Sequence, residues 1–341
     1  MKVWKKLLLS FLATCCLGAI CATFLLYGPV DFFRNLLITT AMTTKDHHWM
    51  AEIFYSEETI NKVLESNVII EVEEETDESL IDIASLSVKN NSTTFEYESE
   101  EERQILERDE DDLYKVISIK GSTYQGYLVA VYDPTRISIG VTRYLGVKGE
   151  NITDIAKANN AIIATNASGF KDPKYQGNGG EPRGVIIQNG KLIWNGKLHL
   201  GGGGIIGFTK EGVLVLSKAS GEQALKNGIY NAVSYAPFLI VNGKASFAKG
   251  DGGWGIAPRT AIGQRADGIV LMLVIDGRQI HSVGASMVDL TEIMQKYGAV
   301  NAAAVDGGSS SALVINNTLI NKPTAHTATG ERRIPSVFMV K

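Results

Sequence analysis

Cysteine is scarce in this chain and is confined to one short region. The three cysteines, Cys15, Cys16 and Cys21, all lie in an apolar run near the start. The residues after this run therefore form no disulfide, offer no thiolate nucleophile and supply no cysteine ligand to zinc. Because a secreted animal enzyme of this size usually carries disulfides, their absence favours a bacterial origin.

The apolar run itself is unusually long. Residues 7–27 are 21 residues without a charge, enough to cross a hydrocarbon layer of about 30 Å as a helix. The basic residues before it are Lys2, Lys5 and Lys6. The positive-inside rule then predicts a cytoplasmic N-terminus (residues 1–6), a transmembrane signal anchor (residues 7–27) and a remainder outside the cytoplasm. A cleaved signal peptide is the alternative, but it has a shorter apolar core and small residues before the cut.

Acidic residues are concentrated in one stretch. Residues 65–112 hold 18 Asp and Glu against 3 Lys and Arg, whereas residues 113–341 hold 14 acidic and 24 basic residues. A stretch so acidic has too little apolar surface to offset the entropy lost on ordering. We therefore expect residues 66–112 to form a solvated acidic stalk or linker. Cation binding by its carboxylates is less favoured, because no EF-hand spacing occurs.

A helical segment is expected between the apolar run and the acidic stretch. In residues 28–65, Ser56 is a good helix N-cap, acidic residues follow it in the first turn, and apolar residues recur at helical spacing. We interpret the segment as a juxtamembrane helical region.

From residue 113 the chain changes to short apolar runs separated by glycine. Runs such as residues 269–275 predict strands. Residues 152–159 and 287–297 predict helices, the second with Ser286 as N-cap. We therefore predict an α+β class, with a strand-rich, mixed-sheet domain over residues 113–341.

Two predicted strands end in Asp-Gly followed by a polar turn. The motifs are Asp276-Gly277-Arg278 and Asp306-Gly307-Gly308-Ser309-Ser310-Ser311. Carboxylates at strand ends reach the loops where binding sites collect. The paired glycines let the backbone approach a ligand and turn its N–H groups toward an anion. Arg259 and Arg278 offer forked donors that suit phosphate. Either motif alone is more simply a hairpin turn or a linker, whereas their conjunction favours a site.

Together these motifs resemble the phosphodiester glycosidase family, the family of the N-acetylglucosamine-1-phosphodiester α-N-acetylglucosaminidase domain. The further matching segments are Asn166-Ala167-Ser168-Gly169-Phe170, Gly180-Glu181-Pro182-Arg183-Gly184, Ala236-Pro237-Phe238-Leu239-Ile240 and Pro258-Arg259-Thr260-Ala261-Ile262-Gly263. The similarity extends over roughly residues 115–341. Two loops depart from the family pattern: the family usually has Asn-Gly-Gly-Phe at the first segment and a third glycine where Ser309 stands.

The resemblance implies hydrolysis between an anomeric carbon and a phosphate oxygen. Because the phosphate leaves as a stabilised anion, such a site needs cations and N–H donors more than a general acid. On this basis Arg259 and the loop Gly307–Ser310 are expected at the phosphate. Asp306 is expected as nucleophile or water activator, and Asp276 at the sugar or in support, although the two carboxylates can be exchanged in this scheme. The secondary candidates for substrate binding are Asn166, Arg183 and Arg278.

No cofactor is expected. No two histidines have the spacing of a zinc motif, while a Ca²⁺ or Mg²⁺ held by Asp and carbonyl oxygens stays open. The expected partners are a carbohydrate phosphodiester and the membrane. Nucleic acid is not expected, because the basic residues are scattered along the chain. The favoured function is an extracytoplasmic hydrolase acting in cell-wall or exopolysaccharide metabolism. The alternative is a non-catalytic glycan-binding or exopolysaccharide assembly protein that uses the same pocket.

Overall fold

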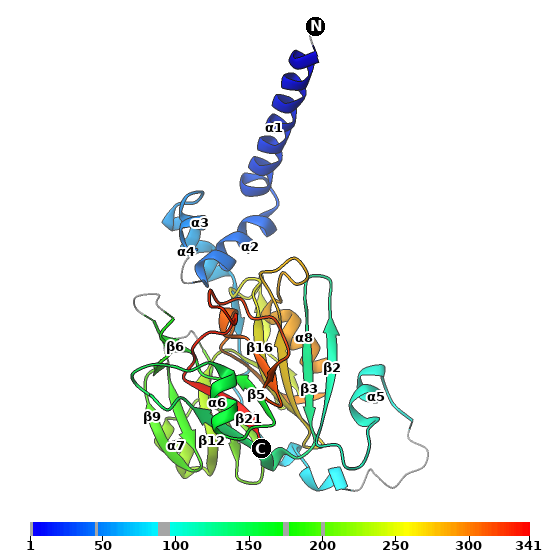
Figure 1. The fold of residues 1–341 in the computed structure, drawn as a ribbon, viewed down its shortest axis with the longest axis vertical. Helices are drawn as coiled ribbons and strands as arrows, with labels where there is room; N and C mark the ends of the chain where they lie inside the picture. Colours follow the sequence, from blue (N-terminus) through cyan, green and yellow to red (C-terminus); the bar gives the residue numbers. More distant parts are fainter. Residues whose placement is uncertain (1–2, 45–46, 88–95, 173–176, 199–201) are drawn as a thin grey trace. The chain divides into compact units, whose positions relative to one another are not determined.

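The structure, a computed structural model, describes residues 3–44, 47–87, 96–172, 177–198 and 202–341 (Figure 1). The chain divides into two units, Met1–Val68 with Lys249–Gly255, and Ile69–Ala248 with Ile256–Lys341. Lys2, which belongs to the expected basic flank, and residues 88–95 of the acidic stretch lie outside the described residues.

Helices and strands follow one another in the order below. The α-helices are α1 (Val3–Tyr27), α2 (Asp31–Met42), α3 (Trp49–Glu52), α4 (Glu57–Ser66), α5 (Glu100–Leu106), α6 (Ile152–Ala158), α7 (Gly221–Lys226) and α8 (Met287–Lys296). Short 3₁₀ helices are η1 (Glu78–Leu80), η2 (Ile83–Ser87), η4 (Pro134–Arg136) and η5 (Gly308–Ser310). The strands are β1 (Val68–Ile70), β2 (Tyr114–Lys120), β3 (Gln125–Val131), β4 (Ile137–Val141), β5 (Ile163–Asn166), β6 (Phe170–Lys171), β7 (Glu181–Pro182), β8 (Val185–Gln188), β9 (Lys191–Asn195), β10 (Gly204–Thr209), β11 (Leu214–Ser217), β12 (Ile229–Tyr235), β13 (Phe238–Val241), β14 (Lys244–Ala245), β15 (Phe247–Lys249), β16 (Arg259–Arg265), β17 (Val270–Ile275), β18 (Ala299–Val305), β19 (Leu313–Ile315), β20 (Thr318–Leu319) and β21 (Ser336–Val340).

The first unit is helical. By length and composition, α1 is the one helix among the described residues that is apolar and long enough to cross a membrane. The expected N-cap of α4 is confirmed, because the Ser56 hydroxyl accepts a hydrogen bond from the Thr59 N–H at 3.3 Å. Helices α2 to α4 share a small buried core. Its members are Ile38, Ala41, Ala51, Tyr55, Ile60 and Val63.

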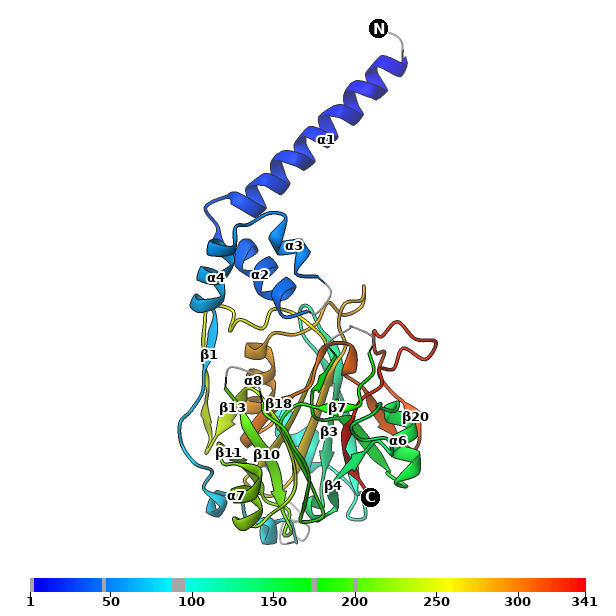
Figure 2. The ribbon, with the colours of Figure 1, turned by 90° about the vertical axis from the view of Figure 1, so that its left-hand side faces the viewer.

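Three larger sheets with antiparallel ladders, and the two-stranded sheet β6-β7, build the second unit (Figure 2). The strand orders of the larger sheets are β14-β13-β18-β16-β17-β3-β2, β11-β10-β12-β8-β9 and β20-β19-β5-β21-β4. Helix α8 packs on β13, β16 and β18, α6 packs on β4, β5, β19 and β21, and α7 packs on β8, β9 and β12. The α+β, strand-rich class expected from the sequence is confirmed.

One hydrophobic core joins the three sheets. On β17, Val270, Met272 and Val274 point into it, as the two-residue period of a strand requires. Strands β4, β10 and β21 contribute alternate residues in the same way, with Phe208 and Phe338 in edge-to-face contact at 6.2 Å. Each fully buried side chain of this size contributes about 1.5–3 kcal/mol, so this core holds the sheets together.

The register of β16 decides which strand ends meet. Arg259 at the start of β16 pairs with Ile275 at the end of β17, and Thr260 pairs with Val305 at the end of β18. Because both ladders are antiparallel, the residues that follow β17 and β18 lie at the same edge of the sheet as Arg259. The helix between them is confirmed as α8, with a capping box formed by Ser286 and Asp289.

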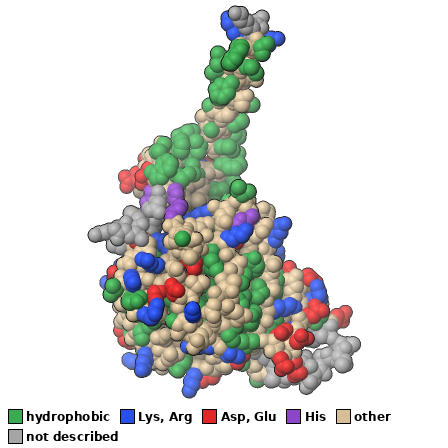
Figure 3. Space-filling model, viewed as in Figure 1, with side chains coloured by type: hydrophobic (Ala, Val, Ile, Leu, Met, Phe, Trp, Pro, Cys, Tyr) green, Lys and Arg blue, Asp and Glu red, His purple; other side chains and the backbone are tan. Residues whose placement is uncertain are grey.

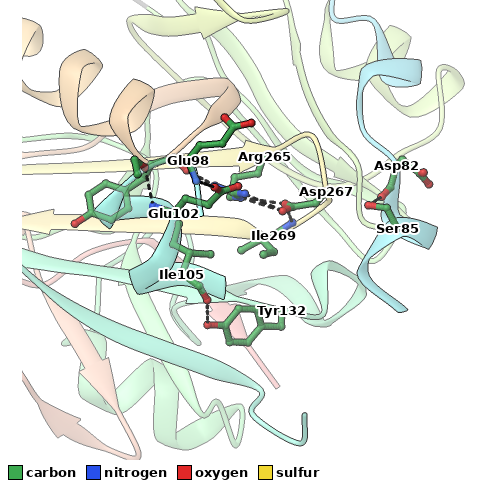
Figure 4. A network of polar contacts seen from close by, with 11 residues as sticks. Asp82, Ser85, Glu98, Glu102, Ile105, Tyr132, Arg265, Asp267 and Ile269 are labelled. Atoms are coloured by element: carbon green, nitrogen blue, oxygen red, sulfur yellow. Dashed lines mark hydrogen bonds and ion pairs between the residues drawn. The ribbon is translucent and has the colours of Figure 1, made fainter. Parts of the chain in front are cut away.

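The acidic stretch differs from the expected solvated linker, since its described residues pack on the second unit. Glu71 Oε1 accepts hydrogen bonds from the N–H groups of Gly203 at 2.7 Å and Phe238 at 2.9 Å, and Oε2 pairs with Lys218. Further along, Ile105 is fully buried and its carbonyl accepts a 2.7 Å hydrogen bond from the Tyr132 hydroxyl (Figure 4). The expectation of a solvated linker was based on average composition. A few side chains at particular positions nevertheless hold the stretch against the second unit.

Replacing Glu71 is expected to destabilise the protein. Glu71→Ala leaves two buried N–H donors without an acceptor, so we expect the free energy of unfolding to fall by about 2–4 kcal/mol. Chemical denaturation of the full chain in detergent measures this loss. The control is Glu73→Ala at an exposed position nearby, which we expect to stay within about 0.5 kcal/mol of the parent. Equal midpoints for the two variants would contradict the anchoring role of Glu71.

Candidate active site

Asp306 follows β18 at the sheet edge where β16 begins. Its N–H donates to Ala167 O at 3.0 Å, and its carbonyl oxygen accepts a hydrogen bond from the Asn166 amide. The backbone of Asp306 is therefore held against the loop that follows β5. Its carboxylate Oδ1 accepts a hydrogen bond from the Tyr235 hydroxyl at 3.2 Å. Asp306 is partly exposed, whereas Asp276 is buried.

Tyr235, at the end of β12, is a site residue that the sequence did not single out. Its side chain is 9% exposed. Burial raises the pKa of Tyr235 well above its usual range; the Asp306 charge raises it further, and Arg259 and Arg183 oppose the rise. The phenol therefore stays protonated at neutral pH and acts as the donor to Asp306. The sole hint was its place directly before the Ala-Pro segment of the family pattern.

Glycine keeps one side of the carboxylate open. A Cβ placed on Gly169 would lie 3.0 Å from Tyr235 Cε2 and 3.6 Å from Asp306 Oδ1. Any larger residue at this position would therefore crowd the pair. The Gly169 carbonyl also accepts a hydrogen bond from the Arg183 N–H at 2.8 Å, which brings β7 and its arginine to the same loop.

Two arginines flank the Gly-Gly turn that follows Asp306. A Cβ on Gly307 would lie 3.8 Å from Arg259 Cδ, and a Cβ on Gly308 would lie 3.5 Å from a terminal nitrogen of Arg278. Arg259 is buried and its Nε donates to Ala285 O at 3.1 Å. Arg278 is exposed, and both it and Gly308 have positive φ angles, of 57° and 61°. The turn thus lies between one buried and one exposed guanidinium.

Two of the four N–H groups of the loop Gly307–Ser310, which the sequence suggested as an anion nest, donate to acceptors within the protein. The N–H of Gly308 donates to Pro258 O at 2.8 Å, and that of Ser310 donates to Gly307 O at 3.2 Å. These donors close the turn on itself and on the start of β16. The Ser309 hydroxyl accepts a hydrogen bond from Arg278 at 3.3 Å.

Asp276 directs its carboxylate into the protein. Oδ1 accepts hydrogen bonds from the Asn321 amide at 2.9 Å and from the Lys322 N–H at 3.0 Å, and Oδ2 lies 3.3 Å from His281 Nε2. Asn321 in turn donates to Ser311 O at 3.1 Å, at the end of the glycine loop. Asp276 is 5% exposed, so these contacts favour the supporting role over contact with a sugar.

Asn166 is likewise occupied within the protein. It is 1% exposed, and its Oδ1 accepts hydrogen bonds from the Thr260 hydroxyl at 2.8 Å and the Ala312 N–H at 3.1 Å. Together with its bond to Asp306 O, it joins β5, β16 and both ends of the glycine loop. We therefore interpret Asn166 as a positioning residue.

The structure thus sorts the sequence candidates into two layers. Asp306 directly precedes the loop Gly307–Ser310, Arg259 and Arg278 flank it, and Arg183 lies near Tyr235. Asp276 and Asn166 lie buried beneath that loop. Within the described part of the chain, no three His, Cys, Asp or Glu side chains gather as a metal site requires. The absence of a cofactor stays a prediction, with Ca²⁺ or Mg²⁺ left open.

The chain is similar in sequence to several known proteins. The chain is 27% identical over 197 residues to the SPbeta prophage-derived uncharacterized protein YomE of Bacillus subtilis, covering 55% of this chain and 29% of that protein. It is 26% identical over 249 residues to the N-acetylglucosamine-1-phosphodiester α-N-acetylglucosaminidase of Mus musculus, covering 64% and 45%. The chain spans less than half the length of these relatives.

The fold also matches a solved structure. It is similar to the zebrafish N-acetylglucosamine-1-phosphodiester α-N-acetylglucosaminidase catalytic domain, with a TM-score of 0.56, 23% identity, and coverage of 68% of this chain and 85% of that one. A sequence model of phosphodiester glycosidases matches residues 159–341, which include every candidate residue above. The chain belongs to the phosphodiester glycosidase family.

Proposed function

We propose that this protein hydrolyses the bond between an anomeric carbon and a phosphate oxygen in glycosyl phosphodiesters of a cell wall or exopolysaccharide, outside the cytoplasm. The observation that carries the proposal is the Asp306 carboxylate, which Tyr235 orients and which is followed by a turn flanked by Arg259 and Arg278. Ordinary glycosidases use two carboxyl groups, one of them to protonate the leaving oxygen. A phosphate monoester leaves as an anion, so one carboxylate with nearby cations suffices.

Asp306 activates the attacking group. It takes a proton from a water molecule whose oxygen bonds to the anomeric carbon, while the bond from that carbon to the phosphate oxygen breaks. The electron pair leaves with the phosphate monoester, whose growing negative charge Arg259 and Arg278 stabilise. Direct attack by the carboxylate, followed by hydrolysis of the glycosyl ester, is the second balanced route. Both routes release a free sugar and a phosphate monoester, and neither requires a cofactor.

The proposed location rests on α1. Its apolar length fits a signal anchor, and Lys5 and Lys6 at its start favour a cytoplasmic N-terminus. The domain that carries Asp306 then lies on the far side of the membrane, where polymers with sugar–phosphate linkages are accessible.

Substrate turnover is the direct test. We expect the full chain in detergent to release free sugar from an α-GlcNAc-1-phosphodiester or from one member of a panel of phosphate-containing wall polymers. Asp306→Asn is the control for contaminating activity. Tight binding to a polymer without any sugar release would favour the alternative, a glycan-binding or assembly protein.

Asp306→Asn is expected to remove turnover while leaving the fold intact. The amide oxygen still accepts the Tyr235 hydrogen bond, but the side chain no longer takes a proton or attacks carbon. We expect kcat to fall by at least about 100-fold, the usual contribution of a positioned base. Initial rates and circular dichroism measure the two effects. Full activity in the folded variant would remove Asp306 from the mechanism.

Tyr235→Phe is expected to weaken catalysis and to change its pH dependence. The lost hydrogen bond to a charged group corresponds to about 10- to 100-fold in kcat/KM. The phenol favours the ionised carboxylate, so without it Asp306 takes up a proton at higher pH. The acidic limb of the pH profile should therefore move to higher pH. Tyr230→Phe, on the same strand, is the control and should leave both quantities unchanged; an unmoved limb in Tyr235→Phe contradicts the positioning role.

A further inference from the structure

Large apolar side chains are exposed on the helical unit that contains α1. They lie on the segment before α2, on its first turn, and on α3 with the residues just after it. The six are Val30, Phe32, Phe33, Trp49, Ile53 and Phe54, between 39% and 65% exposed. Hydrophobic side chains are visible on this unit as well as along α1 (Figure 3). Several large apolar side chains exposed on one small helical unit are typical of an interaction surface.

The exposure of these side chains does not result from a poorly packed core. The same helices bury Ile38, Ala51 and Tyr55 almost completely. Helix α4 meanwhile exposes polar residues, including Glu58 and Lys62. The unit therefore has a buried core, a polar surface and a separate apolar surface, as expected of an element that lies at a membrane interface.

Hydrogen bonds fasten this apolar surface to the end of α1. The Tyr27 hydroxyl donates to Phe54 O at 2.9 Å, and the Tyr55 hydroxyl donates to Leu26 O at 2.9 Å. The two tyrosine rings lie 5.8 Å apart. When α1 crosses a bilayer, its last turn lies near the boundary of the hydrocarbon layer, and these contacts bring Phe54 and its neighbours to the same depth.

We propose that the six exposed side chains form a membrane-interface collar that is inserted among the lipid headgroups and upper acyl chains around α1. Trp and Tyr favour this depth, because their rings are apolar and their N–H and O–H groups are wet. The charged neighbours are compatible with it, since Asp31 pairs with Arg34 at 3.0 Å and Glu52 is exposed. The inference rests on the proposed anchoring by α1 and adds a second, peripheral contact with the same membrane.

Tryptophan quenching by brominated lipid tests the collar. The full chain is reconstituted in phosphatidylcholine vesicles with or without bromine on the acyl chains, and fluorescence is compared for the parent, W4F and W4F/W49F. Trp4 reports on α1 and Trp49 on the collar, while Trp194 and Trp254 are common to all three proteins. We expect brominated lipid still to quench part of the fluorescence of W4F. In W4F/W49F the quenched fraction should be at most half of that in W4F.

The outcomes separate the collar from the anchor. Equal fractional quenching in W4F and W4F/W49F, with stronger quenching in the parent, would overturn the collar and leave the anchor standing. No quenching in the parent would overturn both. Bromines close to the headgroup should quench Trp49 more than bromines deep in the chains, and the reverse order would also contradict an interfacial position. Circular dichroism confirms that each variant keeps its helices.

Discussion

The pairing of β16 with both β17 and β18 is the interaction on which the candidate site depends. A strand between two antiparallel neighbours begins where both neighbours end. Arg259 is thereby placed beside the turn that follows Asp306. A slip of one residue in either ladder would turn alternate side chains to the opposite face and disperse the site. The hydrophobic core shared by the three sheets favours that register, because it takes in alternate residues of β17, namely Val270, Met272 and Val274.

Beneath the site lies a layer of buried polar side chains whose hydrogen bonds are made within the protein. Asn166 joins β5 and β16 to the glycine loop, and Asn321 joins Asp276 to the same loop. Buried polar groups of this kind are costly unless they are paired, so each one strongly specifies the loop conformation. This layer explains how a turn rich in glycine and serine holds a carboxylate in a defined direction.

The acidic stretch is also held in place by a small number of buried contacts. Its net charge is high, yet Glu71 and Ile105 are held by backbone groups and by burial on the second unit. Glu71 and Ile105 therefore belong to the folded second unit, and a fragment that begins at residue 113 would lack these contacts. Average composition describes the stretch poorly, because a few side chains at particular positions supply its attachment.

Much of this architecture was determined locally and could be predicted. The apolar run of α1, the N-caps of α4 and α8 and the Asp-Gly strand ends all depend on neighbours within a few residues. Three interactions could not be predicted from the sequence: the Tyr235–Asp306 hydrogen bond, the hydrogen bond from Asn321 to Asp276, and the hydrogen bonds that Glu71 accepts from backbone N–H groups. Each of these interactions connects residues that are tens of positions apart or more in the sequence. The local patterns that predict helices and strands do not say which distant residues come together. By itself the sequence determined the segments and the residue types available for chemistry. The tertiary structure decided that Asp276 is buried whereas Asp306 stays partly exposed, because only the packed chain brings Asn321 and Lys322 to the Asp276 carboxylate.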